Sequence, residues 1–186
     1  MYQKYIELLQ SRLNEKRFIH SMNVAKKARE MAEKFGADSE KAYFAGLLHD
    51  ICKNDSKENM LQIFEEFGIM LDDVQKTSFK LWHSIAGAAY IEHKLGITDR
   101  ELIDSVRYHT TARANATLMD KIIYLADYIS DERDFDGVDD LRRDLEVGGL
   151  DLCYKSALKM SIIELCEIDK PVHPDTLNAY NSTVLK

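Results

Sequence analysis

Imidazole and carboxylate side chains lie within the apolar helical segments of this chain, and they constrain its fold more than any other feature. Six such residues lie in, or at the end of, a stretch whose apolar residues have helical spacing: His20, His49, Asp50, His83, His109 and Asp127. Burying such groups without partners is costly, so the fold must bring these side chains together or pair each one. Imidazole and carboxylate are ligands for Fe, Mn, Co and Zn ions. The pattern therefore indicates a metal centre for hydrolysis inside a helical core.

The spacing of apolar residues predicts helices throughout the chain and no persistent strand. We expect helices over residues 2–13, 18–35, 57–67, 79–95, 121–130, 150–167 and 176–183, with two more running from Asp38 or Ser39 to Asp50 and from Thr98 to about His109. Gly36, Gly68 and Gly96 supply stops, and Thr98–Glu101 and Thr117–Asp120 read as capping boxes. With only 8 Gly and 2 Pro, the sequence predicts an all-α fold.

Length, charge and cysteine content narrow the class of protein. A chain of 186 residues is normally one domain, so we expect residues 1–186 to form a single unit. No apolar run approaches 18 residues, and the N-terminus has no signal-peptide core, so we expect no membrane partner and a cytoplasmic location. The odd set Cys52, Cys153 and Cys166 fits a reducing compartment. A net charge of −7 argues against nucleic acid as a partner but not against an anionic substrate beside a bound cation.

Two further features could suggest metal binding, but each has a simpler structural interpretation. Residues 131–146 are the most polar part of the chain and are expected to form a solvated surface loop. The loop resembles a calcium-binding loop only in part, because Arg143 occupies the twelfth place, where calcium needs a glutamate. Cys52 lies close to Asp50 but is expected to be a small buried hydrophobic residue.

The candidate ligands differ in what each implies alone. His20 shares a helix face with Val24 and Ala28, so it points inward, where a lone histidine is more often a hydrogen-bonded core residue than a ligand. His49 and Asp50 end an apolar run. Adjacent helical residues point about 100° apart, so this pair can bind one cation only at the helix end or where the helix loosens.

The later candidates lie in equally apolar surroundings. His83 is followed by small residues that let another helix approach closely, whereas His93 lies between charged residues and is expected at the surface. His109 is followed by Thr110 and Thr111, whose hydroxyls and amides can hold an anion. Asp127 lies in an apolar run and needs a cation or several donors.

The order His, His-Asp and distant Asp resembles the HD-domain superfamily of metal-dependent phosphohydrolases. Five segments extend the resemblance to its YqeK-like branch, which cleaves diadenosine tetraphosphate symmetrically: KRFIHSMNVA from Lys16, LLHDICK from Leu47, YHTTAR from Tyr108, KIIYLADYISDER from Lys121 and HPDTLNAYN from His173. The chain departs from the branch at Ala112, where glycine is usual, and at Asp131–Glu132, where Glu-Pro often precedes the arginine. The resemblance implies a single HD-type helical domain.

The resemblance also implies roles for individual residues. The main metal, expected to be Fe with Mn, Co or Zn as alternatives, would be held by His20, His49, Asp50 and Asp127, and a second metal or the phosphates by His83 and His109. The expected catalytic residues are Asp50, Lys53, His83 and His109. The expected substrate-binding residues are Arg17, His20, His83, His109, Thr110, Arg133, Lys170, His173 and Asp175.

The expected reaction is hydrolysis of diadenosine tetraphosphate to two ADP by metal-activated water. Two alternatives stay open: another HD-type nucleotidase or deoxynucleoside triphosphate hydrolase, and a nucleotide-binding regulatory protein with a structural metal. In each case the partner is a small nucleotide. The number of metals, one or two per chain, and a homodimeric state are left open by the sequence.

Overall fold

The computed structural model describes residues 2–185, and every regular element in that range is helical, which confirms the all-α prediction. The α-helices are α1 (Gln3–Arg12), α2 (Glu15–Phe35), α3 (Ser39–Leu48), α4 (Lys57–Glu66), α5 (Asp73–Thr77), α6 (Trp82–Ala89), α7 (Arg100–Arg107), α8 (Leu118–Ile129), α9 (Val138–Glu167) and α10 (Pro174–Val184). A 3₁₀ turn, η1 (Phe79–Leu81), precedes α6, and a π-helical turn, η2 (Tyr90–Lys94), follows it.

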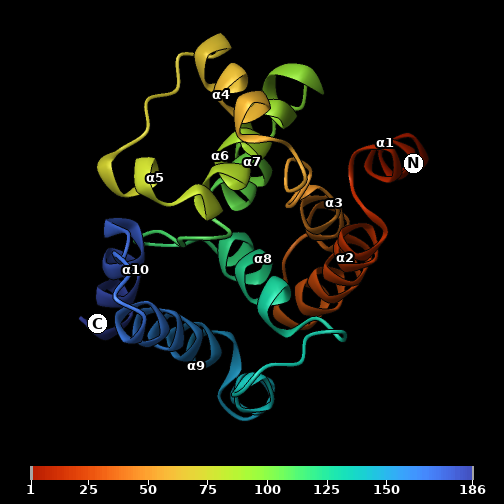
Figure 1. Ribbon diagram of the computed structural model, residues 1–186. Helices are drawn as coiled ribbons and strands as arrows, with labels where there is room; N and C mark the ends of the chain where they lie inside the picture. Colours follow the sequence, from red (N-terminus) through yellow and green to blue (C-terminus); the bar gives the residue numbers. More distant parts are fainter. Residues whose placement is uncertain (1, 186) are drawn as a thin grey trace.

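Helix α8 is the central element of the fold (Figure 1). It contacts α2, α3, α7 and α9, and most of its side chains are buried, including Met119, Ile122 and Leu125. A helix that is apolar on nearly all sides must be surrounded by other helices. The predicted capping box of Thr117 and Asp120 is present at its start. Because α8 is central, Asp127 near its end lies against several other helices.

Helices α2 and α3 pack closely, and their packing sets the position of the first candidate ligands. The Asn14 side chain caps α2, and Gly36 ends it with φ of 81°, as the predicted stop requires. Asp38 caps α3, which ends at Leu48. A Cβ on Gly46 would lie 2.9 Å from the Cα of Ala25, so glycine is needed for this close approach. The end of α3 thus lies beside the buried face of α2.

The expected helix over residues 79–95 is confirmed as one uninterrupted helical run over residues 79–94, but its two ends are not α-helical. The chain forms the 3₁₀ turn η1, then α6, and then the π turn η2, in which the amide of Leu95 donates to the carbonyl of Tyr90. The Trp82 indole donates to the carbonyl of Gln75 at 2.6 Å, which folds the chain between α5 and α6. His83 therefore lies near the start of this helical run, in the first turn of α6, as predicted.

Two other local predictions need correction. Only residues 131–137 of the expected surface loop are non-helical, because Val138, Leu141 and Leu145 form a buried stripe on the first half of α9. Gly149, with φ of 73°, interrupts α9 before the predicted helix 150–167. The cap of α7 is Asp99 and not Thr98, since its carboxylate accepts from the Leu102 amide at 3.2 Å and also pairs with Lys41 at 3.0 Å.

The described helices share one continuous apolar core. Buried side chains from Leu9 in α1 to Ala179 in α10 belong to the same cluster. Cys52 is fully buried in this cluster, as predicted, and His93 is exposed. Among residues 2–185, no helix is both long and apolar enough to span a membrane.

We expect Gly46→Ala to lower the free energy of unfolding by about 1–3 kcal/mol, because the added methyl would overlap the backbone of α2. Chemical denaturation measures the change. Gly87→Ala is the matched control, since its new methyl would lie at ordinary contact distance, 3.5 Å from Ile51 and 3.8 Å from the His49 carbonyl and Val106, and alanine favours a helix by about 1 kcal/mol. Equal effects of the two substitutions would contradict the packing argument.

Candidate metal centre

The structure brings all six candidate ligands into one buried cluster, although they come from five separate parts of the chain. His20 comes from α2, His49 and Asp50 follow α3, His83 begins α6, His109 follows α7 and Asp127 lies on α8. All but Asp127 are buried, and the Asp127 side chain is only 19% exposed. We name these six residues the HD cluster.

Asp50 lies at the centre of the HD cluster and faces different neighbours with its two carboxylate oxygens. Its Oδ2 lies 3.6 Å from His49 Nε2 and 3.9 Å from His20 Nε2. Its Oδ1 lies 3.1 Å from His83 Nε2 and 3.6 Å from His109 Nε2. A single carboxylate can therefore serve two neighbouring cation positions.

Two histidines of the cluster have a fixed tautomer. His49 Nδ1 lies 2.7 Å from the carbonyl of Gly46, and His109 Nδ1 lies 2.7 Å from the carbonyl of Val106. Because a carbonyl only accepts, each Nδ1 carries the proton and each Nε2 keeps a lone pair. Both lone pairs are thus available to a metal ion, with ring orientation set by the backbone.

His20 is held between two carboxylates. Its Nδ1 lies 2.5 Å from Glu132 Oε1, and its Nε2 lies 3.0 Å from Asp127 Oδ1. Sequence reasoning missed Glu132, which lies in the polar segment after α8. The only signal for it was its position beside Arg133, since no helical or motif spacing relates it to His20.

The cluster fits a divalent cation on observations of its own atoms. Within residues 2–185, His49 Nε2 and Asp50 Oδ1 are buried and have no hydrogen-bond partner of good geometry. His83 Nε2 accepts from Lys53 at 3.0 Å and lies 3.1 Å from His109 Nε2, so two lone pairs face each other. Nitrogen and carboxylate donors of this kind suit a borderline divalent metal. The HD cluster therefore has the donor atoms to hold a divalent metal ion.

Three overlapping groups in the cluster have ligand atoms within 4.8 Å of one another: His20–His49–Asp50, His49–His109–Asp127 and Asp50–His83–His109. The first and third share only Asp50, with the geometry described above. The four residues expected to hold the main metal are thus adjacent, and the expected pair for a second position lies on the other side of Asp50.

Burial and charge together move the pKa values of the cluster. Burial raises the pKa of Asp50 and Asp127, but neighbouring histidines and cations outweigh it and hold both well below the usual range. Burial lowers the pKa of His49 to about 3 and that of His83 to about 4. For His20 burial also lowers the pKa, but Asp127 and Glu132 outweigh it and raise the pKa overall.

Three cationic side chains surround the cluster. Arg17 Nη1 lies 3.3 Å from Asp50 Oδ2, and Lys53 Nζ lies 3.5 Å from Asp50 Oδ1. Arg133 pairs with the carboxylate of Asp127 and donates through Nε to the Asp127 carbonyl at 2.7 Å. Each of the three is partly exposed, with 28–32% of its side chain accessible, so their charges face solvent as well as the cluster.

A cleft of about 1190 Å³ opens beside the HD cluster. His83, His109 and Asp127 line it together with Lys53 and Arg133. Of the other expected substrate-binding residues, Thr110, Lys170 and His173 also line it, whereas its lining does not include Arg17, His20 or Asp175. The cleft is large enough for an extended anionic ligand.

His173 has a structural partner in addition to its place in the cleft wall. It is buried, with Nε2 2.8 Å from Asp72 Oδ2 and 3.1 Å from Gln75 Nε2, and its Nδ1 accepts from the Asp175 amide. These contacts tie the start of α10 to α5. The segment after α9 is thereby held against the cleft.

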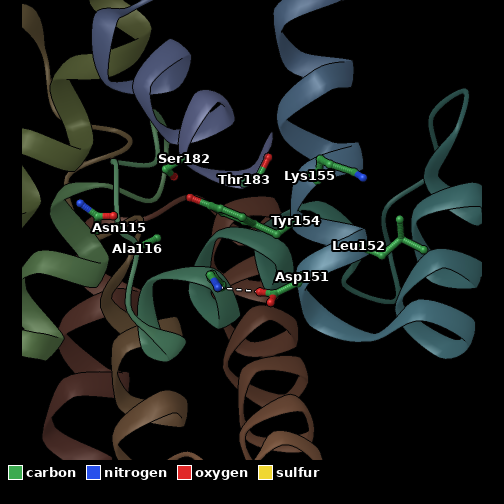
Figure 2. A pocket seen from close by; sticks show the side chains of 9 residues that line it. Asn115, Ala116, Asp151, Leu152, Tyr154, Lys155, Ser182 and Thr183 are labelled. Carbon is green, nitrogen blue, oxygen red and sulfur yellow. Dashed lines mark hydrogen bonds and ion pairs between the residues drawn. The ribbon is translucent and has the colours of Figure 1, made fainter. Parts of the chain in front are cut away.

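A second, smaller cavity of about 360 Å³ is bordered by the segment that precedes α8, by helix α9 and by helix α10 (Figure 2). Tyr154 and Ser182 line it, and the dashed line marks the 2.6 Å ion pair of Lys121 with Asp151. None of its lining residues belongs to the HD cluster or to the larger cleft. Of these two cavities, only the larger cleft is lined by residues of the HD cluster.

Comparison with known proteins agrees with this geometry. A model described as "HD domain" matches residues 17–131. The chain is 39% identical to a Bacillus subtilis (strain 168) protein named "Bis(5'-nucleosyl)-tetraphosphatase, symmetrical", covering 93% of this chain and 92% of that protein. A protein of the same name from Halalkalibacterium halodurans is 34% identical, covering 98% of this chain and 97% of its own length.

The fold has a close counterpart among solved structures. A Clostridium acetobutylicum protein, described as a predicted HD superfamily hydrolase involved in NAD metabolism, superposes with a TM-score of 0.94 at 33% identity. The alignment covers 100% of this chain and 97% of the other. The helical arrangement is thus shared over its full extent.

We expect the metal-free protein to lose stability as the pH falls from 7 to 5, in part because of His83. The unfolded histidine binds a proton below about pH 6.5, whereas the folded pKa is lowered to about 4. In this window only the unfolded state gains the proton. The free energy of unfolding therefore falls by about 1.4 kcal/mol for each pH unit. His83→Gln should reduce the slope in denaturant titrations with a chelator, and exposed His93→Gln should not. Equal slopes in all three proteins would contradict this account.

Proposed function

The chain belongs to the HD domain family, and we propose that it hydrolyses dinucleoside polyphosphates, cleaving diadenosine tetraphosphate symmetrically into two ADP. The observation that carries the proposal is the HD cluster itself, a buried carboxylate with four histidines that opens onto a large cleft with a cationic border. Near-full-length relatives that bear the name of this activity support the choice of substrate.

We assign the main metal to His20, His49, Asp50 and Asp127, and a second position to Asp50, His83 and His109. Iron is the proposed occupant of the main position, and Mn, Co and Zn are alternatives with the same ligand chemistry. When bound, a divalent ion supplies acidity to a water molecule and offsets charge on the phosphoryl oxygens.

The side chains of this site are arranged to stabilise negative charge. Lys53 and Arg133 both line the cleft, one beside His83 and the other beside Asp127, so two fixed cations border the cluster at different points. Such cations lower the energy of charge that develops on the phosphates as the central bond breaks. ADP leaves as an anion, and the same cations stabilise it.

The rest of the substrate occupies the cleft. Thr110 follows His109 and lines the cleft, and its hydroxyl is hydrogen-bonded to that of Ser84 at 3.0 Å. Lys170 and His173 line the part formed by the segment between α9 and α10, where we place a nucleoside. We locate this activity in one domain of residues 1–186 in the reducing cytoplasm, where the free Cys52 and Cys153 stay thiols.

The proposal predicts that diadenosine tetraphosphate gives two ADP and no AMP or ATP when the purified metal-loaded protein is the catalyst. Chromatography of the products after partial turnover measures this directly. Deoxynucleoside triphosphates, nucleoside monophosphates and NAD⁺ are tested in parallel. Faster turnover of one of these would favour another HD-type nucleotidase, and nucleotide binding without turnover would favour a regulatory protein.

We expect Asp50→Ala to remove bound metal and to lower turnover by more than about 100-fold, since it removes a shared ligand and not merely a partner of one. Elemental analysis and product formation are measured on the same preparations, with circular dichroism as the check that the variant is folded. Cys52→Ser is the control, because this buried thiol points to Arg12 at 3.8 Å and takes no part in the site. Full metal content in Asp50→Ala would rule out the ligand set.

A further inference from the structure

We propose that Glu132 is a positioning residue for the metal centre. Its carboxylate accepts a hydrogen bond from Nδ1–H of His20, so that the lone pair of His20 Nε2 faces the cation. The inference rests on the metal site proposed above but not on the identity of the nucleotide.

The contact itself is short and comes from distant parts of the chain. Glu132 Oε1 lies 2.5 Å from His20 Nδ1, across 112 residues of sequence. Ser130 Oγ donates to the same oxygen at 2.9 Å, which fixes the carboxylate from its own loop. The Glu132 side chain keeps 32% of its surface exposed, so its charge stays partly hydrated while one oxygen reaches the buried ring.

The need for Glu132 follows from the place of His20 in its helix. His49 and His109 follow the ends of α3 and α7, so each donates its Nδ1 proton to one of the last carbonyls of its own helix. His20 lies in the first half of the 21-residue helix α2, where the backbone carbonyls accept intrahelical bonds. A ring in that position needs an acceptor from another segment, and Glu132 provides it.

The orientation matters because both nitrogens of His20 face carboxylates. If Asp127 alone held the ring, Nε2 would carry the proton and no lone pair would face the metal position. With Glu132 on Nδ1, the Nδ1–H tautomer is favoured, and the lone pair of Nε2 is available to a cation. A carboxylate behind a histidine ligand also makes the ligand more basic.

The test is Co²⁺ binding to the chelator-treated full-length protein, followed by the visible absorption of the ion in the absence of nucleotide. We expect Glu132→Ala to weaken the affinity by about 10–100-fold. Glu132→Gln should lose less, because its amide oxygen still accepts from Nδ1. Asp131→Asn is the matched control and should bind Co²⁺ like wild type, since Asp131 pairs with Lys27 at 2.9 Å and not with His20.

The stability of the metal-free proteins distinguishes two roles of Glu132, namely orienting His20 and anchoring the loop after α8. If Glu132 merely anchors the segment after α8, Glu132→Ala will lower the unfolding midpoint while its Co²⁺ affinity and spectrum stay those of wild type, and the proposal is overturned. An equal loss of affinity in Asp131→Asn also overturns it. If wild type binds no Co²⁺, the metal site itself fails, whereas inactivity toward diadenosine tetraphosphate with normal Co²⁺ binding leaves this inference intact.

Discussion

The buried carboxylate of Asp50 is the constraint on which the site depends. Its side chain is 2% exposed, yet its pKa is held well below the usual range, so it is a buried anion. A buried anion is stable only with cations or donors on every side. Histidines from α2, from the start of α6 and from the end of α7 lie around this carboxylate, and Arg17 and Lys53 lie beside it as cations. The proposed metal position follows from the same arrangement, because the histidine nitrogens that face Asp50 can act as ligand atoms.

Helix periodicity and helix ends were predictable because they depend on short-range rules. The ends of α2 and α3 and the capping box at Thr117 follow from residues within four positions of each other. The contact that holds the turn between α5 and η1 was not predictable, since it depends on the Trp82 indole reaching the carbonyl of Gln75. The helix after Gly137 was missed because its many acidic residues hid a stripe of three buried apolar residues.

The ligand types of the HD cluster could be read from the sequence because ionisable side chains in apolar helices need an explanation. The residues that contact these candidate ligands from other segments could not be identified from the sequence. The contact between His20 and Glu132 crosses 112 residues and joins a helix to a loop, so no spacing rule relates the two. The same holds for Arg133, whose guanidinium reaches both the backbone and the side chain of Asp127. Residues that orient ligands are fixed by tertiary packing, which sequence patterns do not encode locally.

The distribution of ligands over five segments couples metal binding to folding. In the unfolded chain these side chains are far apart, so the binding free energy of a divalent ion is available only once α2, α3, α6, α7 and α8 have packed. An ion present at 100 times its dissociation constant then adds about 2.7 kcal/mol to the stability of the folded state. That gain offsets the cost of keeping His49 and His83 neutral and Asp50 charged inside the core. On the proposed ligand assignment, the cluster therefore weakens the metal-free protein and strengthens the metal-bound one, as expected for residues placed for chemistry and not for packing.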